Sequence, residues 1–257
     1  MEEFLSYFSS AGLSMNPSKS ELILFRRGRQ EQELTVNGQP EAKKIRLLGV
    51  NVEKGYVFDA HAKQIAATVK TKVEKLSEVL KLLDYKKRKN VTEAIVISTL
   101  SYCLAVWGFR KKCRTRCQKS MNHAIRMVLQ KDNRYSITEG LSVLEWANMD
   151  NLWRLEMITA TRRILETRIP DTIYSIFTGR TGGRYLIRSD GVRSSWWPRN
   201  THGDNAFVNR SVEVFNEMRI AQRVWMHDRE NRALTKSEVR NTIKHELIRQ
   251  YGNENLY

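Results

Sequence analysis

The sequence predicts a mainly α-helical protein with a small α+β segment at its N-terminus. From residue 59 onward, apolar residues recur every three or four positions, which is the period of an amphipathic helix. Before residue 58, short apolar runs alternate with turn residues, as in short strands. The 257 residues are 41 % hydrophobic with only 4 Pro and 13 Gly, which excludes collagen-like and Pro-rich chains and disfavours a disordered one.

Residues 1–58 are predicted to form one helix followed by a β-meander, too small to be a complete domain. The helix covers residues 2–11 and ends at Gly12, which tolerates a left-handed conformation. Turns are predicted at Asn16-Pro17-Ser18 and Asn37-Gly38. Strands are predicted over residues 21–25, 34–36, 45–52 and 56–58, with Gly49 marking a bulge or a close backbone approach in the third.

Residues 59–257 are predicted to be helical, apart from one long loop. Asp59, Ser136, Asp150 and Thr235 are the expected N-caps, with Glu139 and Glu238 completing capping boxes. The helices are expected over residues 59–83, 89–108, 113–131, 136–146, 150–167, 206–224 and 235–251, with Lys86-Lys-Arg-Lys89 in a connection. Residues 178–205, rich in Gly and Arg and containing Trp196 and Trp197, break any helix. We therefore divide the chain into residues 1–58, 59–134 and 135–257.

The net charge of +16 lies almost entirely in the middle of the chain. Residues 61–134 carry 18 basic and 5 acidic side chains, a net charge of +13, whereas residues 1–60 are neutral and residues 135–257 carry +3. A clustered excess of this kind is typical of a protein that binds a polyanion. We favour nucleic acid, since no lipidation motif and no aromatic-edged basic helix supports an acidic membrane. A solvated lysine-rich surface is the alternative.

Enzymatic and metal chemistry has little support in the residues themselves. The 8 Asp residues are scattered, so no clustered pair for Mg²⁺ is visible. Cys103, Cys113, Cys117 and His123 lack the paired spacing of a zinc site, and unpaired helix cysteines explain them better. We expect no metal site, no nucleotide cofactor motif, no membrane span and an intracellular protein. Arg residues and Trp196-Trp197 in the loop fit base stacking and a purely structural role equally.

Several motifs follow one another in a recognisable order. They are Gly12-Leu-Ser-Met-Asn-Pro-Ser-Lys-Ser-Glu-Leu-Ile-Leu-Phe25, Leu47-Leu-Gly-Val50, the helix opening at His61, Ser101-Tyr-Cys-Leu-Ala-Val-Trp-Gly108 and the Gln118–Arg126 segment. This series resembles the back of the palm, the primer-grip hairpin and the thumb of reverse transcriptases from non-LTR (LINE-like, jockey-type) retrotransposons. Trp146, residues 180–200 and residues 205–216 resemble the tail of jockey-type elements.

The resemblance implies a nucleotidyltransferase ancestry, namely that of an RNA-directed DNA polymerase. In that family, the catalytic Asp residues precede the segment that is matched at residue 12, and this sequence begins at Met1. We therefore expect the chain alone to be inactive and to hold no cofactor, with Mg²⁺ required only in a full-length relative. Lys19 matches the motif lysine that lies near the departing pyrophosphate in the family, and Ser20 replaces the usual Thr.

A thumb grips a template–primer duplex by its backbone, so the resemblance and the charge distribution indicate the same partner. We expect an RNA–DNA hybrid or a DNA duplex, bound through phosphates. The candidate contacts are Lys70, Lys72, Lys86, Lys87, Arg88, Lys89, Arg110, Lys111, Lys112, Arg114 and Arg116. Lys86–Lys89 also fits a nuclear localisation signal. The alternative hypothesis is a non-enzymatic interaction protein built on thumb and tail, with a protein or an upstream polymerase fragment as its partner.

Overall fold

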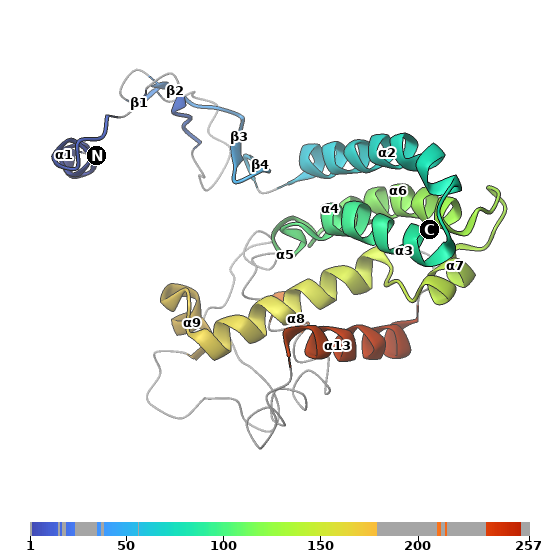
Figure 1. Cartoon of the computed structure of the whole chain (residues 1–257). Coiled ribbons are helices and arrows are strands. Elements are labelled where there is room, and N and C mark those ends of the chain that lie inside the picture. Colours follow the sequence, from blue (N-terminus) through green and yellow to red (C-terminus); the bar gives the residue numbers. More distant parts are fainter. Residues whose placement is uncertain are drawn as a thin grey trace. The chain divides into compact units, whose positions relative to one another are not determined.

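The computed structural model confirms the predicted fold class, with helices from residue 59 onward and small antiparallel strand pairs before it (Figure 1). The structure describes residues 2–14, 16, 19–23, 35–36, 39–55, 57–178, 210–211, 214 and 235–252. The chain forms two compact units, Met1–Val57 and Phe58–Tyr257.

The first unit holds one helix and two short hairpins. Helix α1 (Glu2–Ser10) is followed by Gly12 at φ 68°, which confirms the predicted stop. Strand β1 (Thr35–Val36) pairs with β2 (Gln39–Pro40), and β3 (Lys44–Leu47) pairs with β4 (Val50–Glu53), both antiparallel. Of the strand predicted over residues 21–25, the described part forms only a bridge between Leu22 and Glu41. Both predicted turns lie wholly or partly outside the described residues.

The single strand predicted over residues 45–52 is wrong, because the chain reverses in its middle. Leu47 pairs with Val50, and the two residues between them have φ of 46° at Leu48 and 86° at Gly49. Two consecutive positive φ values are those of a type I′ turn, which closes a two-residue hairpin. Gly49 is therefore a turn residue, not a bulge. The predicted strand at 56–58 is also wrong in its described part, since Phe58 adopts a left-handed conformation with φ 54°.

The second unit is a helical bundle. Its elements are α2 (Asp59–Lys81), α3 (Tyr85–Thr92), the π-helix η2 (Glu93–Ile97), α4 (Ser98–Ser101), α5 (Leu104–Trp107), α6 (Lys111–Leu129), α7 (Ile137–Leu144), α8 (Met149–Thr167), α9 (Asp171–Thr178) and α13 (Lys236–Tyr251). Figure 1 shows α8 in the middle, with α2, α4 and α6 on one side and α13 on the other. The predicted apolar stripe of α6, formed by Cys117, Met121, Ile125 and Val128, is buried in full.

The helix predicted over residues 89–108 starts earlier and is interrupted. Asp84 accepts a hydrogen bond from the Lys87 backbone N–H at 2.9 Å and caps α3, so Lys86–Lys89 is helical and is not a connection. The chain then leaves the helix at Tyr102, where ψ is 117°, and at Cys103, where φ is 50°. The indole N–H of buried Trp107 donates to the Tyr102 carbonyl at 2.9 Å, which stabilises this break.

Two of the four predicted N-caps are confirmed, and two are wrong. Ser136 accepts from the Glu139 N–H, and Thr235 forms a complete capping box with Glu238. The caps of α2 and α8 are Phe58 and Asn148, not Asp59 and Asp150. Asp59 is the first residue of α2 and Asp150 the second residue of α8, and both carboxylates form ion pairs with residues of α6 instead of capping their own helices.

The C-terminal region is anchored by α13. The spacing of four predicts one apolar face formed by Val239, Ile243, Leu247 and Tyr251, of which the first three are buried and Tyr251 is half-buried. Arg240 pairs with Glu156 of α8, and the Arg154 guanidinium lies 4.1 Å from the centre of the Tyr251 ring. The loop predicted over residues 178–205, including its Arg and Trp residues, lies outside the described residues apart from Thr178 at the end of α9. Of the helix predicted at 206–224, only residues 210, 211 and 214 are described, and they are helical.

The approach of α5 to α8 depends on the absence of a side chain at Gly108. A Cβ there would lie 2.6 Å from the Leu104 carbonyl oxygen and 2.8 Å from the Trp153 Cδ1. Real Cβ atoms are not found at such distances, so the backbone or the Trp153 ring would have to move.

We expect Gly108→Ala to destabilise the helical unit by about 1–3 kcal/mol, the usual cost of overpacking a core. Urea unfolding followed by far-UV circular dichroism measures the change. Val106→Ala is the control, because it changes α5 two residues away at a side chain that is 51 % exposed. Equal unfolding midpoints for Gly108→Ala and the parent would show that the contact is not tight.

Candidate nucleic-acid interface

The basic residues of the second unit are positioned by the packing of α6 on α2. The Cys113 and Cys117 thiols face the Phe58 and Ala62 carbonyls, both at 3.8 Å, and the Ser120 hydroxyl donates to the Ala66 carbonyl at 3.0 Å. The numbers of the contacting residues increase together along α2 and α6, so the two helices run parallel, side by side. The small side chains at this seam let the two helices approach closely.

The side of α6 away from the core carries a row of basic side chains. Lys112, Arg116, Lys119, His123 and Arg126 follow at spacings of four and three, which places them on one face; all are exposed or half-buried. At about 1.5 Å per residue, the row is roughly 21 Å long. The 19 residues of α6 include no acidic side chain.

Helix α2 borders this row with further lysines. Lys112 Nζ lies 3.3 Å from the Asp59 carboxylate, so Asp59 marks the side of α2 next to the row. Lys63 and Lys70 follow Asp59 by four and eleven residues on the same side of α2, and both are exposed. We call the surface formed by Lys63, Lys70, Lys112, Arg116, Lys119, His123 and Arg126 the α2–α6 face.

Asp59 is the acidic member at the N-terminal edge of this face. Partial burial acts to raise the pKa of its carboxyl, but hydrogen bonds from Lys112 and Cys113 outweigh burial and hold that pKa below its usual range. Arg110 lies 4.0 Å from the same carboxylate. The carboxylate therefore neutralises part of the charge at this end, whereas Arg116 and Lys119 have no acidic partner in the part of the chain that the structure describes.

Most of the predicted contact residues are at the surface, several of them in exposed ion pairs. The pairs are Lys70–Glu74 at 3.8 Å, Lys87–Asp84 at 3.0 Å, Lys89–Glu145 at 3.4 Å, and Arg110 and Lys112 with Asp59. Lys72 donates to the Thr99 hydroxyl at 2.8 Å, across α2 and α4. Exposed pairs of this kind contribute about 0–1 kcal/mol, so their cations can turn to a phosphate at little cost.

The structure separates the predicted residues into two groups. Lys86–Lys89 lies on α3, beyond the C-terminal end of α2, where Tyr85 also contacts Val143 of α7. Arg110, Lys111, Lys112 and Arg116 lie beside the N-terminal end of α2. Because α2 has 23 residues and is roughly 35 Å long, the two groups lie toward opposite ends of it, with the predicted Lys70 and Lys72 between them on α2.

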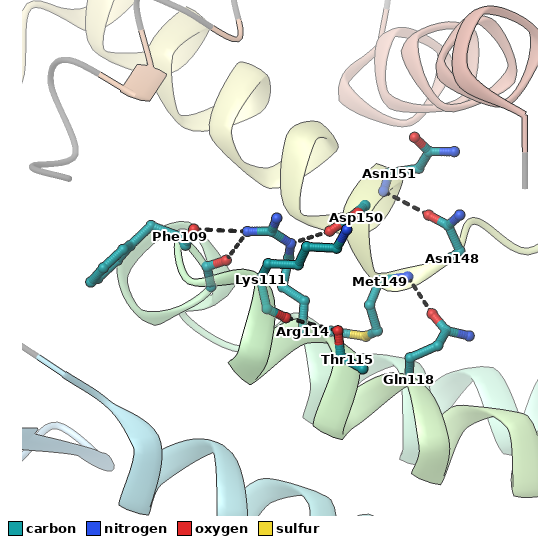
Figure 2. Close-up of polar contacts among 10 residues, drawn as sticks. Phe109, Lys111, Arg114, Thr115, Gln118, Asn148, Met149, Asp150 and Asn151 are labelled. Atoms are coloured by element: carbon teal, nitrogen blue, oxygen red, sulfur yellow. Dashed lines mark hydrogen bonds and ion pairs between the residues drawn. The ribbon is translucent and has the colours of Figure 1, made fainter. Parts of the chain in front are cut away.

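Arg114 is wrongly predicted as a nucleic-acid contact, because its side chain is buried with only 8 % exposed. One guanidinium nitrogen donates to the Gly108 and Phe109 carbonyls at 2.6 and 2.9 Å, and Nε donates to Asp150 (Figure 2). The guanidinium also lies 4.5 Å from the centre of the Trp153 ring. Burial lowers the pKa of Arg114, and the charge of Asp150 acts against that shift.

Amide side chains of α6 and α8 extend the buried polar contacts around Arg114. We call the group formed by Arg114, Gln118, Asn148, Asp150 and Asn151 the buried joint. Gln118 Oε1 accepts from the Met149 N–H at 2.7 Å, and its Nε2 donates to Asn122 at 2.7 Å. Asn148 caps the Asn151 N–H at 2.9 Å, as Figure 2 shows. Asn151 in turn donates to the Gly252 carbonyl at 2.7 Å, after the end of α13. The joint therefore links α6, α8 and α13.

Four cations of the α2–α6 face are absent from the set predicted from sequence: Lys63, Lys119, His123 and Arg126. The signal was present as the repeat Lys112-x-x-x-Arg-x-x-Lys-x-x-x-His-x-x-Arg126. Ranking residues by local charge density selects the dense run at 110–116 instead, and that run includes the buried Arg114.

Cys113 and Cys117 are core residues, whereas Cys103 is half-exposed. Burial raises the pKa of Cys113 to about 11 and that of Cys117 to about 12. A thiolate is the form that binds zinc, so both environments disfavour ligation. His123 faces outward on α6, away from the seam. Among the described residues, no three His, Cys, Asp or Glu side chains gather in a group that could hold a metal ion.

Lys19 is exposed, and its backbone N–H donates to the Asn16 carbonyl at 3.1 Å. Its role as the counterpart of the family's motif lysine stays a prediction.

Comparison with protein families, with curated proteins and with solved structures finds no match to this chain. Within the described residues, none of the helices combines the length and the apolar character needed to cross a membrane.

We expect Arg114→Met to destabilise the protein by about 3–5 kcal/mol, because it leaves Asp150 without its cation and two carbonyls without their donor. Arg116→Met, two positions along α6 and on the exposed face, is the matched control and should cost less than about 0.5 kcal/mol. Chemical unfolding measures both. Equal stabilities of the two variants would show that the buried pair does not hold the bundle.

We expect the thiols to differ in reactivity, with half-exposed Cys103 labelled first at pH 8 and Cys113 and Cys117 protected until the bundle unfolds.

Because folding raises the pKa of both buried thiols, the unfolded chain loses their protons first. Stability should be fully present below about pH 9 and fall as the pH rises through 11. A Cys113→Ala/Cys117→Ala variant should lose stability less steeply over this range, and Cys103→Ala should follow the parent.

Proposed function

We propose that this chain binds nucleic-acid duplexes, either RNA–DNA hybrids or DNA, through phosphate contacts made by the α2–α6 face. We further propose that it is related to the reverse transcriptases of non-LTR retrotransposons and that the helical unit corresponds to their thumb and tail. The observation that carries the binding proposal is the cationic row of α6, on a helix with no acidic residue.

The composition of the face favours contacts to the backbone over contacts to bases. Base edges are read chiefly by amides and by bidentate arginines. The two amides within α6 that could do so, Gln118 and Asn122, are buried and hydrogen-bonded to each other. What remains on the face is Lys, Arg and His, which suit phosphates. We therefore expect binding that depends on duplex shape and charge and is indifferent to sequence.

The rigid seam between α2 and α6 holds these cations in a fixed relation to one another. Phosphate contacts release counterions, and each contributes about 0.9 to the slope of log K against log salt. With Lys63, Lys112, Arg116, Lys119 and Arg126 engaged, we expect a slope of about −4 to −5.

Lys86, Lys87 and Arg88 on α3 provide a second, separate contact or a nuclear localisation signal, and we propose a nuclear location on that basis.

The test is the affinity for an RNA–DNA hybrid measured by fluorescence anisotropy across a salt series. An Arg116→Gln/Lys119→Gln/Arg126→Gln variant should bind more weakly at low salt, with a slope that is shallower by about 2 to 3. The matched control is Arg163→Gln/Arg168→Gln/Arg249→Gln, which removes the same charge from exposed positions elsewhere on the unit. The control should keep most of the parent's slope.

If both triple variants weaken binding equally, net charge and not the α2–α6 face determines affinity, and the proposed interface is wrong. If the parent shows no salt-dependent binding, the cationic row is a solvated surface. A four-residue variant, Lys86→Ala/Lys87→Ala/Arg88→Ala/Lys89→Ala, separates the α3 group, because its loss should leave the contribution of the α2–α6 face in place.

A further inference from the structure

A second surface of the helical unit is apolar and lies where α2, α3 and α7 meet. Val79, Leu82, Tyr85 and Val143 expose 53, 87, 42 and 49 % of their surface. We call these four side chains the α2–α3 corner. Val79, Leu82 and Tyr85 lie within seven residues of one another, and Tyr85 reaches Val143 through its hydroxyl. Single exposed apolar residues are common on protein surfaces, but a group of them contributed by neighbouring elements is typical of an interaction site.

The corner departs from the pattern of the helix that leads into it. The outward positions of α2 before it are mostly polar, including Lys63, Gln64, Lys70 and Glu74. Val79 and Leu82 then occupy the outward side at its C-terminal end. Both side chains are largely outside the core, to which Leu80 contributes at this end of α2.

The corner is held in a fixed arrangement by polar contacts beneath it. The Tyr85 hydroxyl donates to the Val143 carbonyl at 3.3 Å, which ties α3 to α7 across 58 residues of sequence. Asp84 caps α3 between Leu82 and Tyr85. A partner would therefore meet a largely preformed surface and lose little free energy in ordering it.

The charge around the corner is positive. Lys75, Lys81, Lys86 and Lys87 each lie within four residues of Val79, Leu82 or Tyr85 in the sequence, and all four are exposed. The nearby acids are already engaged, Glu78 with Lys81 at 2.8 Å and Asp84 with Lys87 at 3.0 Å. An apolar centre with a cationic rim is complementary to a segment with an apolar stripe and acidic flanks.

We infer that the α2–α3 corner docks an acidic amphipathic segment of a partner protein. A second copy of this chain is a poor occupant, since the net charge of +16 repels it. Nucleic acid is a poor occupant as well, because phosphates cannot cover Val79 and Leu82. The corner is thus a protein-binding site distinct from the α2–α6 face, and either proposal can be wrong without affecting the other.

The test uses the full chain and a fluorescein-labelled helical probe peptide with Leu at positions i, i+3, i+4 and i+7 and Glu on both flanks. A peptide of the same composition, with Leu and Glu permuted so that no apolar face forms, is the comparison. We expect the first peptide to bind about tenfold more tightly than the second. Val79→Ser/Leu82→Ser should weaken its binding by about tenfold.

Leu47→Ser/Leu48→Ser is the matched control, because these leucines are 57 and 82 % exposed but lie in the first unit. This control should leave peptide affinity unchanged. Equal binding of both peptides, or equal loss in both variants, would overturn the inference. Circular dichroism of both variants confirms that they are folded.

Discussion

The ion pair between Arg114 and Asp150 is the constraint on which the helical unit depends. A buried guanidinium needs its charge balanced and its donors satisfied. Here Asp150, the Gly108 and Phe109 carbonyls and the Trp153 ring meet that need together. These partners come from two segments, the α5–α6 connection and the start of α8, so the cation determines where both segments must lie relative to α6.

This constraint makes α6 a helix with two separate roles. Its core side carries Arg114, Gln118 and Asn122, which join α6 to α8 and, through Asn151, to the end of α13. Its outer side carries cations without any acidic neighbour in the helix. Trp107, Gly108 and Gln118 belong to segments whose sequence resembles non-LTR reverse transcriptases, a relationship that we propose, and all three lie in or beside the buried joint. These segments therefore hold the geometry of the bundle, which in turn presents the basic row of α6.

Local patterns predicted most of the helical elements, because apolar periodicity depends only on neighbouring residues. These patterns gave wrong predictions where a side chain contacts a partner far away in the sequence. Asp59 and Asp150 have the composition of N-caps, yet Lys112 and Arg114 take their carboxylates. The run at 45–52 has the composition of one strand, yet Leu48 and Gly49 turn it back on itself. For the candidate interface, the sequence indicates the basic segment. The contacts predicted from it, however, include Arg114, which is buried, and omit Lys119, which is exposed.

The sequence by itself determined the fold class, the concentration of charge between residues 61 and 134, and the course of the longer helices. These properties follow from composition and from short-range periodicity. Only the tertiary structure decided which cations are structural and which face solvent, and that Lys86–Lys89 and the N-terminal end of α6 lie far apart. The physical reason is burial: the role of a charged side chain depends on whether another element covers it, and contacts between residues 36 or more positions apart settle that.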